Sequence, residues 1–533
     1  MSRTSSNTLG EYLIRCLEAC DTDYVFGIPG VHTVSLYRGL AVSSIRHITP
    51  RHEQGAGFMA DGYARISGKP GVCFVITGPG LSNIATAMLQ ARADSIPMLV
   101  ISTINDPDRH ARGSLHEMPD QTAFAKTVAT SSSLVTNGAE LRAALDAAYS
   151  LFSSGRRGPV HIELPLSAIN APCDDALPDM HNAPKPTPSA ARLQKAIDLI
   201  GSWEKPLILA GGGAGKAGSQ ILDLAEHLGA PVVTTVNARS AFPNDHPMAV
   251  HASASLMAVR SLIAQADGLI AMGTELGPTD YDMYETLGPV SGAQMVRVDV
   301  DPNQAQLNAE PDVILIGDAG EIAALLRTEL APQHHSWADQ IAAARQSVTA
   351  ELSSDYQSHI ALLNSIRDAV PDTVFVGDST QLVYAGNLAF APGDTGNWFN
   401  SATGYGTLGY GLSAAMGAKL ADEERPVLCI IGDGGLQFAL GDLGTLAALG
   451  VPVVVLVWND SAYGEIAQSM RAAGIAEEVI AVSCEVTAPD FATIARAYGL
   501  DAMRHVGKAG LAESVAQALA SKTSVVIDAQ IAQ

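Results

Sequence analysis

The chain has 533 residues, enough for roughly two to four domains, and an apolar fraction ordinary for a globular protein. Its formal net charge of −23 argues against a general nucleic-acid-binding surface or an anionic-membrane surface. Because no apolar run approaches the ~20 residues of a membrane helix and the polar N-terminus carries no secretory pattern, we expect a cytoplasmic protein. The six cysteines are scattered and are expected to be reduced thiols.

The first block, to about residue 170, alternates short apolar runs with Ala- and Leu-rich helical stretches. Strands are expected at residues 24–28, 72–77 and 98–103. Glycine- and proline-containing turns follow the first two runs, at residues 27–30 and 78–80. This alternation is typical of βαβ units around a parallel sheet.

A proline-rich stretch from Pro172 to Pro188 reads as a stiff linker. The second block, about 190–330, starts with a strand at 206–210 and ends in another at 296–300. Residues around 330–345, which include the stretch 331–336, are expected to form a second linker.

The third block repeats the pattern, with strands expected at 373–377, 426–431, 452–458 and 524–529. The predicted fold class is therefore α/β, with three doubly wound parallel-sheet domains. Their expected bounds are 1–170, 190–330 and 355–533.

A glycine-rich turn follows the buried strand expected at 427–431: Gly432, Asp433, Gly434 and Gly435, then a helical stretch at 436–449. Such a turn exposes backbone N–H groups and the positive end of a helix dipole, which suits phosphate. Asp433 can hold a magnesium ion that bridges phosphate oxygens. Taken alone, the turn could also be purely structural.

A second strand ends at Asn459-Asp460-Ser461-Ala462-Tyr463-Gly464. Because neighbouring strand ends converge on one crevice in a doubly wound sheet, Asp460 and the Ala462 carbonyl are expected to complete the metal shell. An ordinary Asx turn is the alternative reading. A third strand ends at Ser379, Thr380 and Gln381, whose side chains are candidates for the terminal phosphate.

These residues resemble the motifs of thiamine diphosphate-dependent enzymes. Gly432-Asp433-Gly434 with Asn459-Asp460 is similar to the metal-and-diphosphate motif of that family, and the stretch 404–409 to its pyrimidine-binding loop. Residues 51–65 resemble the segment that carries the catalytic glutamate, and residues 76–80 with Asn83 also match. The resemblance covers essentially the whole chain and is nearest to the branch of acetolactate synthases, benzoylformate decarboxylases and 2-oxo acid decarboxylases.

The resemblance implies a role for each matching residue. Glu53 would be the catalytic residue and would bond N1′ of the cofactor's aminopyrimidine, so that the 4′-imino group removes the thiazolium C2 proton. The Gly406 carbonyl would accept from the 4′-amine and Leu408 would bend the cofactor beneath it. The implied cofactor-binding residues are Gly30, Glu53, Ser379, Thr380, Gln381, Gly406, Leu408, Asp433, Gly434, Gly435, Asp460, Ala462, Tyr463 and Gly464. The implied magnesium ligands are Asp433, Asp460 and the Ala462 carbonyl.

In this family the glutamate acts in a pocket between two chains, so a homodimer is the minimum expected unit and a homotetramer the expected assembly. Two departures stand out. Most relatives have Asn-Asn where this chain has Asn459-Asp460, which adds a negative charge beside the diphosphate. Where acetolactate synthases use an arginine to contact FAD, the matching element here is Gly273-Thr274-Glu275, so bound FAD is not expected.

The substrate pocket of relatives is usually apolar at the position of Glu465. A carboxylate there needs a partner, and a cationic guanidinium tail is the natural one. With the turn at 27–33, Glu465 resembles the 5-guanidino-2-oxopentanoate (2-oxoarginine) decarboxylase group. The alternative is that Glu465 pairs with an internal arginine or faces solvent. His32, His52, His116 and Gln121 are further pocket candidates, for which a structural or surface role is equally open.

The expected function is non-oxidative decarboxylation of a small-molecule 2-oxo acid. An acetolactate synthase-like carboligase is the alternative, since the sequence does not separate protonation from ligation of one intermediate. A non-catalytic cofactor-binding paralogue is the remote alternative, which the presence of Glu53 disfavours.

Overall fold

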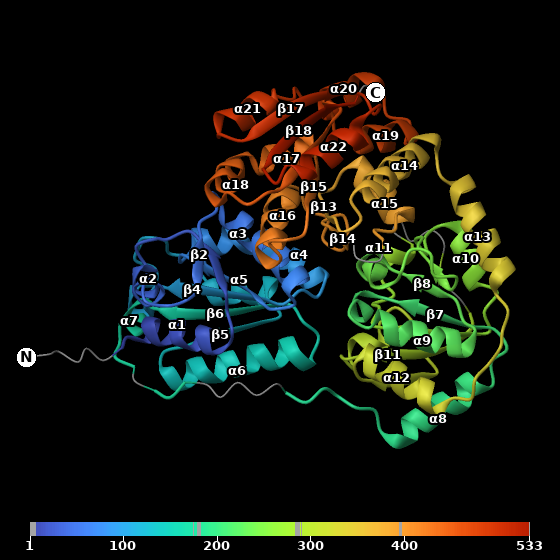
Figure 1. The fold of residues 1–533 in the computed structure, drawn as a ribbon. Coiled ribbons are helices and arrows are strands. Elements are labelled where there is room, and N and C mark those ends of the chain that lie inside the picture. The colour runs from blue at the N-terminus through green and yellow to red at the C-terminus, as the bar shows by residue number, and fades with distance from the viewer. Residues whose placement is uncertain are drawn as a thin grey trace, which may run out of the picture.

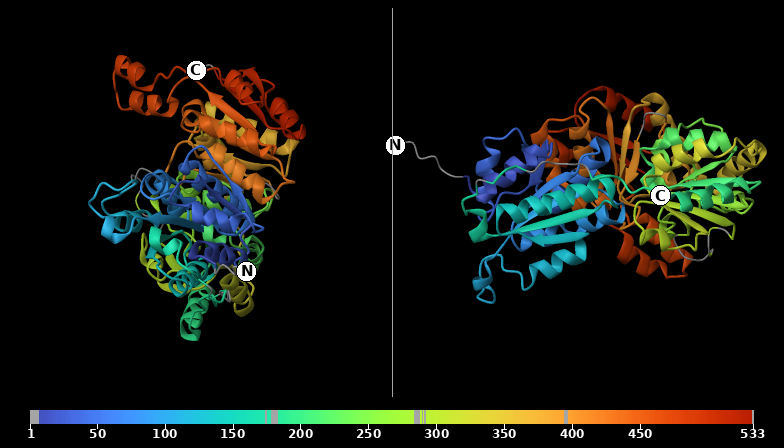
Figure 2. Two further views of the ribbon diagram at one scale, coloured as in Figure 1. Left: turned by 90° about the vertical axis from the view of Figure 1, so that its left-hand side faces the viewer. Right: turned by 90° about the horizontal axis from the view of Figure 1, so that it is seen from below.

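The computed structural model describes residues 7–173, 175–177, 183–282, 288, 290, 292–393 and 397–531. Its strands form three six-stranded sheets in which every described pairing is parallel. The three sheets and their covering helices lie at the corners of a triangle, and the orange to red C-terminal part contacts both others (Figures 1 and 2). The predicted α/β fold with three doubly wound parallel sheets is confirmed.

The N-terminal sheet has the order β2-β1-β3-β4-β6-β5. Its strands are β1 (Tyr24–Gly27), β2 (Arg46–Ile48), β3 (Gly71–Val75), β4 (Met98–Ile104), β5 (Ser131–Leu134) and β6 (Pro159–Pro165). The helices around it are α1 (Leu9–Ala19), α2 (Val34–Leu40), α3 (Glu53–Ser67), α4 (Pro79–Ala93), α5 (Gln121–Val128), α6 (Gly138–Ser154) and α7 (Leu166–Ile169). Local signals set their ends: a capping box of Thr8 and Glu11 starts α1, and left-handed Gly68 ends α3.

The central sheet has the order β12-β11-β10-β7-β8-β9. Its strands are β7 (Pro206–Ala210), β8 (Val232–Thr234), β9 (Ala249–Val250), β10 (Gly268–Met272), β11 (Gln294–Asp299) and β12 (Val313–Ile316). Its helices are α8 (Ala190–Gly201), α9 (Gly218–Leu228), α10 (Met257–Ile263), α11 (Pro278–Tyr281) and α12 (Ala319–Glu329). Helix α13 (Ala338–Glu351) packs on α10 and leads to the C-terminal domain.

The C-terminal sheet has the order β14-β13-β15-β16-β18-β17, the same topology as the N-terminal sheet and different from the central one. Its strands are β13 (Val374–Gly377), β14 (Asn397–Asn400), β15 (Val427–Gly432), β16 (Val454–Asn459), β17 (Asp501–Val506) and β18 (Val525–Gln530). Its helices are α14 (Ser354–Ala369), α15 (Gln381–Ala389), α16 (Tyr410–Ala421), α17 (Asp433–Phe438), α18 (Leu443–Leu449), α19 (Gly464–Ala472), α20 (Glu477–Cys484), α21 (Phe491–Ala497) and α22 (Leu511–Ala520).

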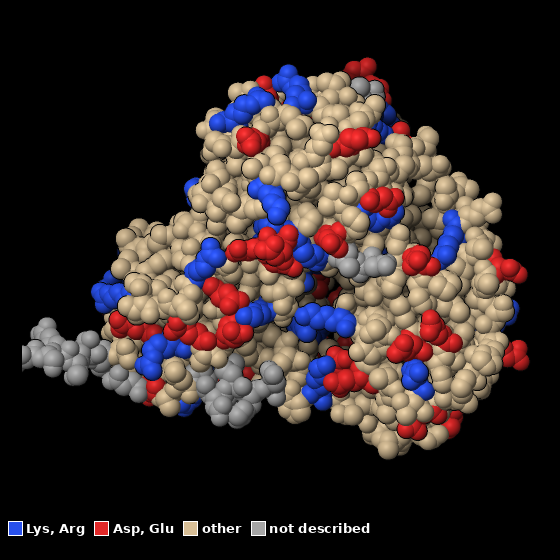
Figure 3. Space-filling model, in the orientation of Figure 1, with Lys and Arg blue, Asp and Glu red and all other residues tan. Residues whose placement is uncertain are grey.

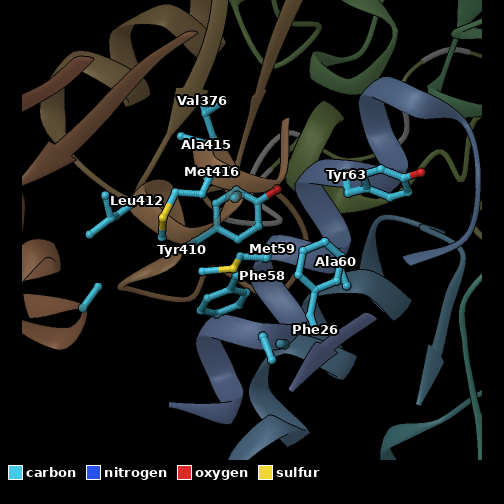
Figure 4. Packing of buried hydrophobic residues seen from close by; sticks show 14 of the residues in the cluster. Phe26, Phe58, Met59, Ala60, Tyr63, Val376, Tyr410, Leu412, Ala415 and Met416 are labelled. Carbon is cyan, nitrogen blue, oxygen red and sulfur yellow. The ribbon is translucent and has the colours of Figure 1, made fainter. Parts of the chain in front are cut away.

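One hydrophobic core joins the N-terminal and C-terminal domains. Helices α3 and α16 pack closely, and the rings of Phe58 and Tyr410 meet edge to face at 5.2 Å (Figure 4). Two glycines permit this approach, because a Cβ on Gly62 would lie 2.0 Å from the Ala414 carbonyl oxygen and one on Gly417 1.9 Å from that of Met59. The two domains are therefore held as one packed unit.

Polar contacts complete the junction of the three domains. Acidic and basic side chains gather along the seam where the N-terminal domain meets the other two (Figure 3). Arg156, in the loop after α6, pairs with Glu275 of the central domain, and Ser240 accepts a hydrogen bond from the backbone N–H of Trp398.

The helix after β15 differs from the prediction. The sequence places its start at residue 436 and continues it to 449, whereas α17 begins at Asp433 itself and ends at Phe438, with a separate helix α18 after a 3₁₀ turn. A carboxylate is favoured in the first helical turn, and neither Gly434 nor Gly435 has a positive φ that would break the helix.

Other expectations have simpler outcomes. All six cysteines are free thiols. No helix among the described residues is both long and apolar enough to cross a membrane. In the expected proline-rich linker, Pro178 lies outside the described residues, as do Met1 to Ser6 at the N-terminus.

Candidate functional site

Three neighbouring strand ends in the C-terminal sheet bring the predicted diphosphate residues together. β15 lies between β13 and β16, and their carboxyl ends lead to Asp433, Ser379 and Asp460 respectively. The chain changes direction across the sheet at this point, where open α/β sheets bind ligands.

Asp433 is the first residue of α17 and is only 2% exposed. Its Oδ2 has no hydrogen-bond partner among the described residues. Burial, followed by the charge of Asp460, raises the pKa of Asp433 to about 7. A buried carboxylate with an unpartnered oxygen beside a second carboxylate is stabilised by a cation, so these residues fit a divalent metal.

Asp460 lies in the turn after β16. Its Oδ1 accepts a hydrogen bond of 3.3 Å from the Ala462 N–H, and burial raises its pKa. Gly464 packs closely there, because a Cβ on it would lie 2.3 Å from Asp460 Oδ2 and 2.8 Å from Gln381 Nε2. Ser461 has a φ of 55°, and the next residues are fixed to α20 through the Tyr463 N–H and the Cys484 carbonyl. The turn therefore has one defined shape, with the Asp460 carboxylate beside Asp433.

The glycines of α17 are required by their neighbours. A Cβ on Gly434 would lie 2.7 Å from the Tyr463 ring, and one on Gly435 would lie 2.9 Å from Asp378 Oδ1. Glycines at a helix start let the backbone approach a neighbour or a ligand closely, as phosphate sites require. Thr380 lies against Gly432 from the other side.

Asp378 is a site residue that was not predicted from the sequence. It is fully buried, accepts hydrogen bonds from the N–H groups of Ser379 and Gly411 at 2.9 Å, and has its pKa raised to about 6 by burial. It fixes the end of β13 to the start of α16. A lone aspartate at a strand end gives no local signal of this role.

The glycine-rich stretch 404–409 lies against the same strand ends. Ser379 Oγ donates to the Thr407 carbonyl at 3.3 Å. Gly406 has a φ of 72° and is exposed, and a Cβ placed on it would meet nothing within 4 Å, so its carbonyl region is open to a ligand. Leu408 is half-buried, and Gly409 is the left-handed residue that starts α16.

Glu53 belongs to the N-terminal domain, as the first residue of α3, and is 8% exposed. Asn83 Nδ2 of α4 donates a hydrogen bond of 2.9 Å to its Oε2. His52 is the N-cap of this helix, with its Nδ1 accepting from the Gln54 N–H, which is a structural role. Glu53 is thus held near a carboxyl-end turn of the N-terminal sheet.

Gln121 is 2% exposed and serves the same end of the sheet. Its Oε1 accepts from the Gly78 N–H at 3.0 Å, and its Nε2 donates to the Thr103 carbonyl at 2.9 Å. These bonds fix the left-handed turn at Gly78 that starts α4. The amide of Gln121 is therefore engaged at both ends by the protein's own groups.

Gly30 and His32 lie in the turn after β1. Gly30 packs on Ile76, where a Cβ would lie 2.2 Å from the Ile76 Cδ1. The rings of His32 and His116 meet edge to face at 5.1 Å, and burial lowers the pKa of His32. The two histidines form one partly buried pair beside the Gly78 turn, because a Cβ on Gly78 would lie 2.3 Å from the His116 carbonyl oxygen.

Glu465 lies in the first turn of α19, directly after the Asp460 turn, and is half-buried. The Tyr356 hydroxyl of α14 lies 3.3 Å from each of its carboxylate oxygens. Burial raises the pKa of Glu465, and no Lys or Arg among the described residues is close enough to pair with it. Among the described residues, the neighbour of this carboxylate is the Tyr356 hydroxyl and not an arginine, and the side chain remains partly exposed to solvent.

The predicted site residues therefore form two groups on one chain. Glu53, Gly30, His32 and Gln121 belong to the N-terminal half-site, at the end of that sheet. The others, including both aspartates and Glu465, belong to the C-terminal half-site.

Family models match along most of the chain. They are described as the N-terminal TPP binding domain, the central domain and the C-terminal TPP binding domain of thiamine pyrophosphate enzymes. The matched residues are 7–124, 193–326 and 378–529, respectively.

The chain is also similar to curated proteins along nearly its whole length. The chain is 41% identical over 501 residues to a probable 2-ketoarginine decarboxylase of Pseudomonas aeruginosa, covering 92% of this chain and 88% of that protein. It is 30% identical over 550 residues to the acetolactate synthase large subunit of Parasynechococcus marenigrum, covering 97% of this chain and 86% of that protein. It is 31% identical over 552 residues to an acetolactate synthase large subunit of Mycobacterium tuberculosis, covering 98% of this chain and 87% of that protein.

Proposed function

Because this chain belongs to the thiamine pyrophosphate enzyme family, we propose that it is a thiamine diphosphate- and Mg²⁺-dependent decarboxylase of 5-guanidino-2-oxopentanoate (2-ketoarginine). When bound, thiamine diphosphate supplies the carbanion chemistry and the electron sink that decarboxylation of a 2-oxo acid needs. The protein's part is to hold the cofactor, move protons and select the substrate.

The C-terminal half-site carries the diphosphate and its metal in this proposal. Asp433 and Asp460 supply carboxylates and Ala462 a backbone carbonyl, a donor set that Mg²⁺ accepts together with phosphate oxygens. The unpartnered Oδ2 of buried Asp433 supports this assignment. The hydroxyls of Ser379 and Thr380 and the amide of Gln381 are candidates for phosphate contacts at the neighbouring strand end.

Glu53 is the proposed proton-transfer residue toward the aminopyrimidine. Its low exposure and the Asn83 hydrogen bond favour one fixed orientation of the carboxylate. The carbonyl of Gly406 and the side chain of Leu408 are assigned to the same half of the cofactor.

We propose that the working unit is a homodimer at least, in which the N-terminal half-site of one subunit faces the C-terminal half-site of another. Large apolar side chains exposed beside both half-sites support this: Leu115 is 62% exposed next to His116, Tyr405 is 49% exposed and Phe438 61%. Such exposed apolar side chains are typical of surfaces that a partner covers. At limiting Mg²⁺, equal mixtures of the impaired Glu53→Gln and Asp433→Asn subunits should regain activity after exchange, because one mixed site is then intact.

Glu465 determines the substrate specificity in this proposal. A half-buried carboxylate without a basic partner is costly, and a guanidinium group offsets that cost with two parallel hydrogen bonds. The similarity to a probable 2-ketoarginine decarboxylase supports the same substrate. Tyr356 holds the carboxylate at 3.3 Å and fixes its direction.

The decisive experiment measures CO₂ release from a panel of 2-oxo acids with and without thiamine diphosphate and Mg²⁺. We expect cofactor-dependent turnover that is highest with 2-ketoarginine and lower with its neutral analogue of equal length. Activity confined to short neutral acids would overturn the role of Glu465.

A carboligase is the second candidate, supported by the acetolactate synthase relatives that align with nearly the whole chain. Product analysis with pyruvate as sole substrate separates the two, since acetolactate would indicate ligation.

We also propose that the central domain binds no FAD. Glu275 lies just after β10 and pairs with Arg156, which places a carboxylate where a flavin pyrophosphate would need positive charge. The two glycine-containing turns beside it contact each other through their backbones, because the Gly213 N–H donates to the Gly273 carbonyl at 2.9 Å.

A further inference from the structure

Gln90 is a fully buried residue of α4, in the N-terminal domain, whose side chain contacts the glycine-rich stretch of the C-terminal domain. Its Nε2 donates to the Thr403 carbonyl at 3.2 Å, and its Oε1 accepts from the Thr407 N–H at 3.5 Å. One amide therefore contacts both ends of the segment that contains Gly406.

Asp94, at the C-terminal end of α4, strengthens this contact. Its carboxylate accepts from Thr403 Oγ1 at 3.1 Å and from Gln90 Nε2 at 2.9 Å. It also accepts from Asn237 of the central domain at 3.0 Å and from Arg65 of α3 at 2.6 Å. Donors from all three domains thus converge on one carboxylate whose side chain is 2% exposed.

The segment also lies directly on α4. Gly404 has a φ of 59°, and a Cβ on it would come within 2.7 Å of the Ala93 Cβ. From the opposite side Ser379 Oγ bonds the Thr407 carbonyl. The residues flanking Gly406 are therefore fixed by two different domains, while Gly406 itself is exposed.

We propose that Gln90 and Asp94 are positioning residues, which hold residues 403–407 in the shape that receives the aminopyrimidine half of the cofactor. The inference rests on the proposed function, since it assigns this stretch to the aminopyrimidine. Helix α4 then contributes to both half-sites. Asn83, in its first turns, hydrogen-bonds Glu53. Gln90, about two turns later, hydrogen-bonds the segment that contains Gly406.

The test compares two ligands that share the diphosphate end. Thiamine diphosphate reaches both the metal site and the 403–407 segment, whereas inorganic pyrophosphate reaches only the metal site. Binding of each, with Mg²⁺, is measured by calorimetry on the full-length protein. In Gln90→Met, which nearly keeps the volume and removes the two hydrogen bonds to this segment and the one to Asp94, we expect the affinity for thiamine diphosphate to fall about tenfold, or about 1.4 kcal/mol. The affinity for pyrophosphate should stay within about twofold of the wild-type value.

Thr403 gives an independent variant of the same contact. Thr403→Val removes the hydroxyl that binds Asp94 and should shift thiamine diphosphate affinity in the same selective way, and Thr403→Ser should restore it. Gln194→Met is the matched control, because Gln194 is an exposed residue of α8 that bonds Asp198 on the same helix.

Three outcomes would overturn the inference. They are unchanged thiamine diphosphate affinity in Gln90→Met and Thr403→Val, equal weakening of both ligands, and a loss in the Gln194→Met control. If wild-type protein binds pyrophosphate but shows no added affinity for thiamine diphosphate, the proposed function itself is wrong.

Discussion

The side-chain amide of Asn83 donates a hydrogen bond of 2.9 Å to Oε2 of Glu53, and it does so from a different helix. An amide N–H can only donate, so it favours a lone pair on that oxygen and leaves the proton to the other one. Under the proposed function, Oε1 is therefore the oxygen expected to exchange a proton with the cofactor.

Glu53→Gln should lower kcat by about 10²–10⁴-fold, because the amide has the same shape but cannot act as a general acid or base. Thiamine diphosphate should still bind, which calorimetry checks alongside CO₂ release. Turnover at the wild-type rate would show that Glu53 has no catalytic role.

Asn83→Leu should have a smaller effect, about tenfold on kcat, since it removes the hydrogen bond but keeps the carboxylate. In Glu53→Gln the same leucine substitution should cost little more, because the two residues act together. Fully additive losses would argue that Asn83 acts elsewhere.

The proposed magnesium site predicts the effects of three treatments, which are chelation, Asp433→Asn and Asp460→Asn. Chelation of Mg²⁺ should abolish binding of thiamine diphosphate, and added Mg²⁺ should restore it. Asp433→Asn should lower the affinity for Mg²⁺ by about tenfold or more, since the buried carboxylate is lost. Asp460→Asn should keep activity with weaker Mg²⁺ binding, because the amide oxygen remains a ligand without the charge.

Asp528→Asn is the matched control for these metal-site variants. Asp528 is a buried carboxylate of the same sheet that accepts from Asn459 at 2.8 Å. Mg²⁺ affinity that falls equally in Asp528→Asn and Asp433→Asn would contradict the ligand assignment.

The strands and turns of the site were predictable because their signals are local. A continuous apolar run followed by Gly432-Asp433-Gly434 marks a buried strand and a ligand turn within about ten residues of sequence. The sequence predicts the start of α17 three residues too late, since glycines normally argue against a helix and only packing against Tyr463 and Asp378 requires them here. Local pattern therefore locates a turn better than it defines its geometry.

Residues that act across domains could not be predicted in this way. Gln90 and Thr403 form a hydrogen bond although they are 313 residues apart in the chain. Tyr356 and Glu465 are likewise 109 residues apart. Glutamine in an Ala-rich helix and tyrosine near a helix start carry no periodic or spacing signal, so only the packed structure identifies their partners.

Glu465→Gln should change which substrate is preferred. Loss of the charge should lower kcat/KM for 2-ketoarginine by about ten- to hundredfold, as expected for a hydrogen bond to a charged group. Neutral 2-oxo acids of similar length should be used equally well or better. A parallel loss for both classes would place Glu465 in cofactor binding or folding instead.

The same residue sets a pH dependence. Burial raises the pKa of Glu465, so this carboxylate is protonated at a higher pH than an exposed glutamate. As the pH falls into that range, the carboxylate loses its charge and KM for 2-ketoarginine should rise. The effect of pH on the free energy of unfolding is opposite in sign to that of a carboxylate paired with a basic group. The folded-state pKa exceeds the unfolded one, so stability is full below the unfolded pKa and is lost as the pH rises through the folded pKa. Substrate-free Glu465→Gln should therefore melt above wild type at neutral pH and match it in acid.

The proposal that the protein binds no flavin is tested on purified protein. We expect no flavin absorbance after expression with riboflavin present, and no FAD binding by calorimetry. A stoichiometric flavin would contradict the repulsion assigned to Glu275, and Glu275→Arg then shows whether charge alone controls binding.

The packing of α3 on α16 leads to the last prediction. Gly417→Ala places a methyl group 1.9 Å from the Met59 carbonyl oxygen, which is backbone and cannot move aside without displacing its helix. We expect a destabilisation of about 1–3 kcal/mol or more, seen as a lower thermal unfolding midpoint. Gly201→Ala is the matched control, since nothing lies within 4 Å of its Cβ and alanine is the better helix former. Because α3 also begins with Glu53, Gly417→Ala should lower kcat below the melting transition as well. Equal midpoints for the two variants would show that the two domains do not depend on this contact.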